Sequence, residues 1–192
     1  MGRTYTKKRR AEQESATRAR IVDATVDLHT RIGPADTTFS MIAERAGVQR
    51  HTLYAHFPDE RTLLMACSGH TFAHDPPPVA EAWRTLAEGR ARLLAGLRDI
   101  YGWYARNAQL LANVTRDAER HAVTREITEM RFGPVIAAWH EVLGVKLLVR
   151  QRALLALALS FQSWRTLAHE AQLQPALAAR LMVDAILGLR EK

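Results

Sequence analysis

The sequence predicts an all-α protein, with an N-terminal three-helix domain and a C-terminal helical bundle that dimerises. Three observations lead to this fold class. Apolar residues recur at three- and four-residue spacings along most of the chain, as on one face of a helix. Gly47 separates two short helical patterns at a point where the chain must turn sharply. The helical pattern over residues 145–171 is apolar nearly all round in its middle part, ALLALALSFQSW, as in a helix with several partners or in a dimer.

Length and composition limit the number of domains and the classes of protein to which the chain can belong. A chain of 192 residues with 47% apolar and 24% charged residues suits a globular protein of one or two domains. The formal charge of +7 suits a polyanionic partner, although net charge says nothing about fold. The single cysteine, Cys67, cannot form an internal disulfide, and no segment reaches the roughly 20 apolar residues of a membrane span. A cytoplasmic protein without a membrane partner is therefore expected.

The N-terminus is strongly basic. Residues 1–14 are expected to form a flexible arm, because their first ten contain five basic residues and no acid: Arg3, Lys7, Lys8, Arg9 and Arg10. Ser15 or Thr17 can cap the first helix, which Gly33 and Pro34 end. This helix would supply the third wall of a small core, since two short helices cannot bury their apolar faces alone.

The segment from Thr38 to Phe57 resembles two short helices joined by a tight turn. Thr38 can cap the first, whose apolar residues Met41, Ile42, Ala43 and Ala46 share one face. Gly47 can enter the left-handed conformation that ends it. Leu53, Tyr54 and Phe57 mark the second helix. This pattern indicates a helix-turn-helix within residues 15–59, although an ordinary helical hairpin has the same spacing.

A DNA-binding interpretation gives the outward side chains of the second short helix a role. Long polar side chains there can reach base edges in the major groove, and the candidates are Gln49, Arg50, His51 and Thr52. Contacts to phosphates give affinity without sequence choice, and the candidates for them are Lys8, Arg9, Arg10, Thr38, Tyr54 and His56. The alternative is a solvated helix surface.

The rest of the chain is predicted to be helical as well. A linker helix over residues 60–74 precedes the prolines at 76–78, and residues 75–192 form the C-terminal domain. Further helices are expected over residues 79–106, 107–119, 124–143 and 145–171, and a last one from Pro175. Gly133 and Pro134 are expected to kink the third of these. The last two helices could pair with a second copy, and the interface candidates are Leu155, Leu159, Leu177 and Leu181.

Aromatic residues in the C-terminal domain could line a cavity for a small molecule. The candidates are Trp103, Tyr104, Asn107, Phe132, Trp139, Gln162 and Trp164. Gln162 is the most informative of them, because a buried amide among apolar neighbours needs a partner. The alternative is that these aromatic residues are plain core.

Three segments together resemble one known family. TRARIVDATVDLHTRIG, TFSMIAERAGV, and TLYAHF with the residues up to Leu63 are similar to the N-terminal domain of the TetR family of bacterial transcriptional regulators. The resemblance implies an all-α homodimer that binds a double-stranded DNA operator and a small-molecule effector. Two departures stand out. The family usually has Phe where this chain has His29, and a phosphate-contacting Lys where it has Glu60, so Arg61 could supply that contact.

The sequence shows no catalytic pattern. It lacks a Gly-rich phosphate loop, a nucleophile elbow and a paired carboxylate motif, so no enzyme and no cofactor are expected. His70 and His74 lie one helical turn apart, but a zinc site needs at least three ligands, so no metal is expected. The leading hypothesis is a ligand-responsive repressor that acts on a near-palindromic operator. The alternatives are a dimeric DNA-binding protein without effector, and a small-molecule binding protein that has lost DNA binding.

Overall fold

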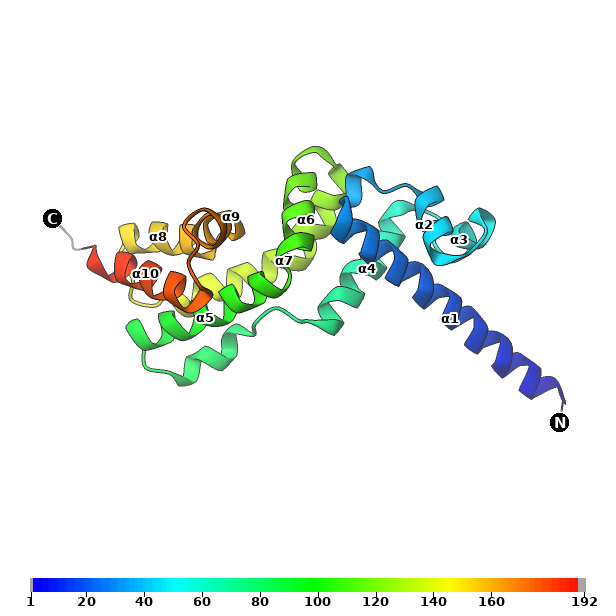
Figure 1. Ribbon diagram of the computed structural model, residues 1–192. Coiled ribbons are helices and arrows are strands. Elements are labelled where there is room, and N and C mark those ends of the chain that lie inside the picture. The colour runs from blue at the N-terminus through cyan, green and yellow to red at the C-terminus, as the bar shows by residue number, and fades with distance from the viewer. Residues whose placement is uncertain (1, 190–192) are drawn as a thin grey trace. The chain divides into compact units, whose positions relative to one another are not determined.

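The computed structural model describes residues 2–189, with side chains described from residue 8 onward. Within that range every regular element is a helix, which confirms the all-α fold class (Figure 1). The chain forms two compact units, Met1–Pro76 with Ala112–Thr128, and Pro77–Leu111 with Glu129–Lys192. Residues 112–128, which the sequence pattern placed in the C-terminal domain, thus pack with the first unit. None of the described helices is long and apolar enough to span a bilayer.

The first helix begins much earlier than the sequence pattern indicates. α1 runs over Gly2–Arg31, so the prediction of a flexible arm over residues 1–14 is wrong (Figure 1). Ser15 and Thr17, proposed as caps, lie inside this helix. The physical reason is local composition. From Arg3 to Ile32 there is neither Gly nor Pro, and the basic residues are followed by Ala, Glu and Gln, which favour helix.

The first unit is built round one small core. α1 packs against α2 (Phe39–Ala46) and α4 (Glu60–His74), and α2 packs against α3 (Arg50–His56). Their inward residues form one cluster: Ile21, Val22, Ala24, Ile42, Ala43, Ala46, Leu53, Phe57, Leu63 and Cys67. The three predicted helices share this core, and α4, which was predicted as a linker helix, contributes Leu63 and Cys67 to it as a fourth. Burial raises the pKa of the Cys67 thiol to about 12, so the thiol stays protonated and unreactive.

The second unit is a helical bundle. α10 (Pro175–Gly188) packs on α5 (Arg90–Arg106) and on α8 (Val149–Leu159), and α9 (Phe161–Arg165) follows α8. α6 (Ala108–Arg120) and α7 (Ala122–Leu143) each begin in one unit and end in the other. α7 contains Pro134 in its interior, so the predicted helix does continue past this residue, and the kink expected at Gly133 and Pro134 stays a prediction.

Two predicted long helices are interrupted. The first, over residues 79–106, is a 3-10 segment Ala80–Thr85 followed by α5, because Gly89 at φ +81° separates them. The second, over residues 145–171, divides at Ser160, whose backbone is extended. There the hydroxyl groups of Tyr101 and Tyr104 donate to the carbonyl oxygens of Ala158 and Leu159, at 2.9 and 2.6 Å. A π-helical turn, Thr166–Glu170, follows α9.

The packing of the last helices corrects part of the predicted dimer interface. Leu155 and Leu159 are buried within their own unit, so they are not available to a second copy. Leu177 and Leu181 are 53% and 47% exposed. α10 instead buries a face of smaller side chains against its own unit: Ala178, Ala179, Val183 and Ile186. The 3.6-residue period alone does not identify the buried face of a largely apolar helix. Which face of α10 is buried was therefore decided only by its packing against neighbouring helices.

Candidate functional site

The turn between α2 and α3 has the predicted geometry. The Thr38 hydroxyl accepts a hydrogen bond from the Met41 N–H at 3.3 Å and caps α2. Gly47 adopts φ +64° and ψ 41°, the left-handed conformation that costs glycine least. The N–H of Val48 then donates to the Ala43 carbonyl at 2.9 Å, which closes the helix end. These contacts confirm the helix-turn-helix.

α3 presents a polar exposed face. Leu53 and the following Phe57 are fully buried and anchor the helix to the core. The four residues predicted to contact bases lie at its beginning: Gln49, Arg50 and His51 are exposed, and Thr52 is partly buried. The Thr52 Oγ1 lies 3.3 Å from His51 Nε2. Because Leu53 and Phe57 fix the helix on the core, the exposed side chains of Gln49, Arg50 and His51 are held on its outer side.

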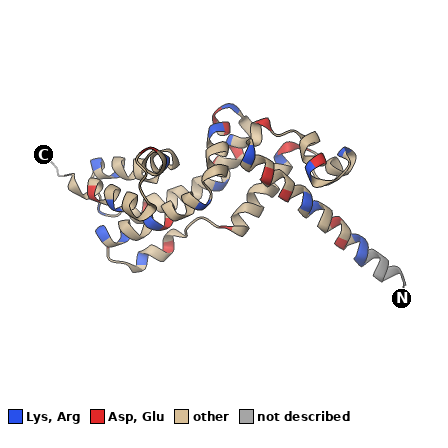
Figure 2. Cartoon of the chain, viewed as in Figure 1, with Lys and Arg blue, Asp and Glu red and all other residues tan. Residues whose placement is uncertain are grey.

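The residues predicted to contact phosphates are also accessible. Lys8, Arg9 and Arg10 are exposed on α1, where basic and acidic residues alternate (Figure 2). Thr38 is exposed, and His56 is partly buried. Tyr54 shares the apolar spacing of Leu53 and Phe57 but is accessible. Its side chain is 45% exposed and its ring lies 5.0 Å from that of Phe39.

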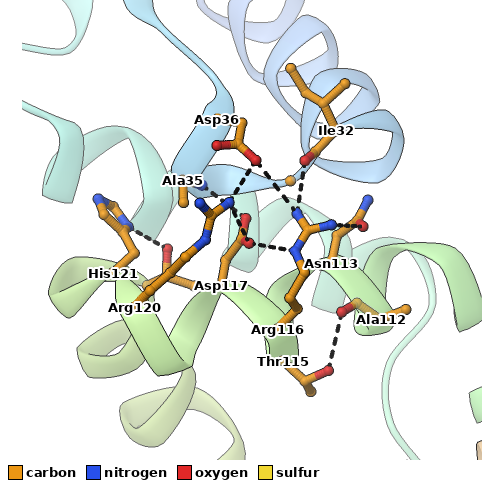
Figure 3. Close-up of polar contacts among 12 residues, drawn as sticks. Ile32, Ala35, Asp36, Ala112, Asn113, Thr115, Arg116, Asp117, Arg120 and His121 are labelled. Carbon is orange, nitrogen blue, oxygen red and sulfur yellow. Dashed lines mark hydrogen bonds and ion pairs between the residues drawn. The ribbon is translucent and has the colours of Figure 1, made fainter.

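A buried carboxylate anchors the segment that leads into α2. Asp117 of α6 is fully buried and accepts hydrogen bonds from the Ala35 N–H, Arg116 Nε and Arg120 Nη2, at 3.0, 2.8 and 3.3 Å (Figure 3). Burial acts to raise the pKa of this carboxyl, but the hydrogen bonds from Arg116, Ala35 and Arg120 outweigh it and lower the pKa. Asp117 is therefore charged at neutral pH.

Further contacts from α6 hold the end of α1. The Asn113 amide donates to the carbonyl oxygens of His29 and Thr30, at 3.2 and 2.8 Å. Arg116 Nη2 donates to the Ile32 carbonyl at 2.9 Å (Figure 3). Gly33, at φ +98°, leaves no room for a Cβ, which would overlap Asp117 Oδ2 and Arg116 Nη2. The approach of α6 to this turn therefore requires glycine.

The same α6–α7 region also contacts the start of α4. Asp59 caps α4 by accepting from the Thr62 N–H at 2.7 Å. His121 Nε2 lies 3.4 Å from Glu60 Oε2, and Arg61 Nη2 lies 2.8 Å from Glu126 Oε1. Arg61, predicted to contact phosphate, thus has an intramolecular partner. Residues 113–126 therefore hold the chain on both sides of the helix-turn-helix.

His29 is buried near this cluster. The pKa of its imidazole is lowered to about 4, mainly by burial. The Asp117 charge acts to raise this pKa, and the His121 charge acts to lower it. Only 6% of the residue is exposed. The polar side chain in this core position is consequently neutral at physiological pH.

The second unit brings most of the predicted effector residues together. The Tyr104 ring centroid lies 5.7, 5.8 and 6.3 Å from those of Trp103, Trp164 and Trp139. Phe132 lies 5.7 Å from Trp103, and the Asn107 amide donates to the Trp103 carbonyl at 3.1 Å. Gln162 is exposed, so the expectation of a buried amide is wrong. The sequence pattern missed this because Gln162 lies in the short helix beyond the Ser160 break.

Trp164 has an unusual buried polar atom. Its Nε1 is buried and has no hydrogen-bond partner among the described residues. By contrast, the Trp83 Nε1 donates to Asp99 Oδ2, and the Trp139 Nε1 to the Pro78 carbonyl, both at 2.8 Å. A buried donor without a partner is rare and costs free energy, so it calls for an explanation.

Replacing Trp164 is expected to cost less stability than replacing Trp139. Trp139→Phe leaves the Pro78 carbonyl without its donor, a loss of about 1–3 kcal/mol, whereas Trp164→Phe removes a donor that is already unpaired. Both changes delete the same indole volume from buried sites, so the cavity costs are comparable. Urea unfolding followed by circular dichroism measures the difference. A larger loss for Trp164→Phe would contradict this assignment.

The Asp117 cluster was not predicted from the sequence. Asn113, Arg116, Asp117 and Arg120 share one face of a helix that the sequence did predict, at spacings of three and four residues. That spacing is the feature of the sequence that could have indicated the cluster. A polar helix face is usually solvated, however, so only the contacts with residues 29–36 show that this face of α6 holds another segment of the chain. No group of three or more side chains suited to a metal ion occurs within the described range.

Comparisons with known proteins agree on one family. The model of the bacterial regulatory proteins of the tetR family matches residues 21–67. The chain is 36% identical over 78 residues to the class A tetracycline repressor protein from transposon 1721 of Escherichia coli, and 33% identical over 92 residues to the class C tetracycline repressor protein of Escherichia coli. These matches cover 38% and 43% of this chain, and 35% and 41% of the two repressors.

Solved structures extend the similarity to nearly the whole chain. A TetR-like transcriptional regulator from Rhodococcus sp. RHA1 matches with a TM-score of 0.62 at 19% identity, over 89% of this chain and 93% of that chain. The transcriptional regulator FadR from Bacillus subtilis, in complex with stearoyl-CoA, matches with a TM-score of 0.64 at 18% identity, over 90% and 99%. At these identities the similarity establishes the fold. The relatives are repressors or regulators, in agreement with the expectation of a non-enzymatic protein.

Proposed function

We propose that this chain, whose residues 21–67 match the model of the tetR family of bacterial regulatory proteins, is a ligand-responsive transcriptional repressor that binds a near-palindromic DNA operator. The observation that carries the proposal is the polar segment Gln49–Thr52, whose first three residues are exposed and which the buried Leu53 and Phe57 hold in place. In the major groove, Arg50 can donate two hydrogen bonds to guanine and Gln49 can pair with adenine. His51 and Thr52 have shorter polar side chains, and each can add a single hydrogen bond to a base edge.

Phosphate contacts would set the register of this helix on the duplex. Thr38, Tyr54 and His56 flank the base-reading row, and each is at least partly exposed. Lys8, Arg9 and Arg10 would add sequence-independent affinity from α1, and Arg61 from the start of α4.

A homodimer would supply the two reading heads that a near-palindrome requires. Leu177 and Leu181 on α10 and Leu157 on α8 are each about half exposed. α8 and α10 pack against each other, so these leucines belong to one pair of helices. Large apolar side chains exposed on neighbouring helices favour a partner surface, and a second copy of the chain is the partner we propose.

The aromatic cluster of the second unit is the proposed effector site. A ligand with an apolar body would contact the rings around Tyr104, and an acceptor atom on it would satisfy the unpaired Trp164 Nε1. The bound stearoyl-CoA of the Bacillus subtilis regulator is a ligand with a long apolar part. Such a ligand can relieve repression only if it binds the DNA-free and DNA-bound states with different affinity.

A second function has one observation in its favour. The Tyr104 hydroxyl, which could have bound a ligand, already donates to the Leu159 carbonyl at 2.6 Å, and its ring lies against five other aromatic rings. This arrangement also suits a filled core, and hence a dimeric DNA-binding protein that needs no effector. Thermal unfolding with a panel of apolar carbonyl compounds separates the two functions, since only the first predicts stabilisation that Trp164→Phe reduces.

Selecting bound duplexes from a random pool tests the operator proposal. The wild-type chain should enrich near-palindromes, and Arg50→Ala should lose preference at one position in each half-site. A bidentate contact from arginine to guanine is worth about 1–3 kcal/mol, so discrimination there should fall by roughly tenfold or more. Far-ultraviolet circular dichroism serves as the control for folding. An unchanged enriched sequence would remove Arg50 from the reading face.

A further inference from the structure

The α6–α7 region contacts the segments on both sides of the helix-turn-helix through polar contacts of two kinds. On the side that leads into α2, the fully buried Asp117 accepts a hydrogen bond from the Ala35 N–H at 3.0 Å. On the side that leaves α3, Arg61 donates to Glu126 Oε1 through Nε at 2.9 Å and approaches it through Nη2 at 2.8 Å. The first contact is part of the core. The second lies at the surface.

The surface pair is open to exchange. The side chains of Arg61 and Glu126 are 55% and 52% exposed. In such surroundings the solvent screens the attraction, and a pair of this kind contributes only about 0–1 kcal/mol. Another anion can therefore replace the Glu126 carboxylate at little cost to the fold.

The position of Arg61 makes a DNA phosphate the relevant competing anion. Arg61 lies in the first turn of α4, five residues after His56, which ends α3. Asp59 caps the same helix and Glu60 begins it, so two acids precede Arg61 in the chain and a third, Glu126, pairs with its guanidinium. A phosphate at the start of α4 would therefore compete with Glu126 for Arg61.

We propose that Glu126 competes with DNA for Arg61. When the chain binds DNA, the guanidinium exchanges the carboxylate of Glu126 for a phosphate oxygen, and no covalent bond changes. Glu126 thereby weakens binding to all DNA sequences. This inference rests on the proposed DNA-binding function.

The test is a double-mutant cycle on the full-length chain. Fluorescence anisotropy with a labelled mixed-sequence duplex gives the dissociation constants of wild type, Glu126→Gln, Arg61→Gln and the double variant at several salt concentrations. Glu126→Gln should bind tighter by up to about fivefold, which corresponds to the upper end of about 1 kcal/mol for an exposed pair, and Arg61→Gln should bind more weakly. In the Arg61→Gln background, Glu126→Gln should have little further effect.

Glu119→Gln is the matched control, because Glu119 is an exposed acid of α6 and the change in net charge is the same. A gain for Glu126→Gln that equals the control, or that persists without Arg61, would show a general charge effect and overturn the proposal. No gain at all would also overturn it. Failure of the wild-type chain to bind any duplex at low salt would instead refute the proposed function itself.

Discussion

Asp117→Asn should lower the free energy of unfolding by about 2–4 kcal/mol, because hydrogen bonds to a charged group contribute about 1.5–3 kcal/mol each. The buried carboxylate accepts from three donors, at Ala35, Arg116 and Arg120. An asparagine can accept through one oxygen only, and its amide hydrogens would face the remaining donors. Both arginines are about half exposed and can be solvated, which limits the loss. Urea unfolding of the full chain, followed by circular dichroism, measures it.

Asp36→Asn provides the matched control. Asp36 also pairs with Arg120, at 2.6 Å, but its side chain is 51% exposed. An exposed pair contributes about 0–1 kcal/mol, so this variant should remain close to wild type. Equal losses for Asp36→Asn and Asp117→Asn would show that burial does not distinguish the two carboxylates. That result would contradict the stabilising role assigned to the buried Asp117.

His29→Phe should remove a pH dependence of stability. The pKa of His29 is about 4 in the folded chain, below the value of about 6.5 expected when unfolded. Below pH 6.5 the unfolded chain therefore binds a proton that the folded chain does not, and stability falls as the pH is lowered towards 4. Since each pKa unit corresponds to 1.36 kcal/mol, the full loss is about 3 kcal/mol.

The measurement is urea unfolding at a series of pH values between 7 and 4. The wild-type chain should lose stability across this window, and His29→Phe should lose much less. The Asp117 carboxyl has a lowered pKa, so its contribution persists above its unfolded pKa of about 3.9 and is lost only in more acidic solution. The two groups therefore act in different windows. Identical pH profiles for wild type and His29→Phe would refute the assignment to His29.

The DNA-reading candidates were predictable from the sequence because their determinants are local. Thr38, Gly47 and the spacing of Ile42, Leu53 and Phe57 set the cap, the turn and the buried face within 20 residues. Exposure of Arg50 and His51 follows, since the opposite face is buried. The early start of α1 also has a local cause, because nothing in the basic run breaks a helix, although a run of like charges is typical of a flexible arm.

The effector and dimer candidates were less predictable because their environment is set by distant residues. Gln162 is exposed only because Ser160 interrupts the helix, and the freed carbonyl groups are satisfied by Tyr101 and Tyr104, more than 50 residues away. Leu155 is buried because of neighbours in its own unit. In a helix that is apolar all round, the period carries no information about which side meets which partner.

The sequence by itself determined the all-α class, the cap and turn of the helix-turn-helix, and the outward row Gln49–Thr52, since each depends on residues close together in the chain. The tertiary structure alone decided that Asp117 and its arginine partners hold residues 29–36, that Arg61 pairs with Glu126, and that Leu155 faces its own core. These contacts join segments about 60–85 residues apart, and a one-dimensional pattern of spacings does not specify which distant faces meet.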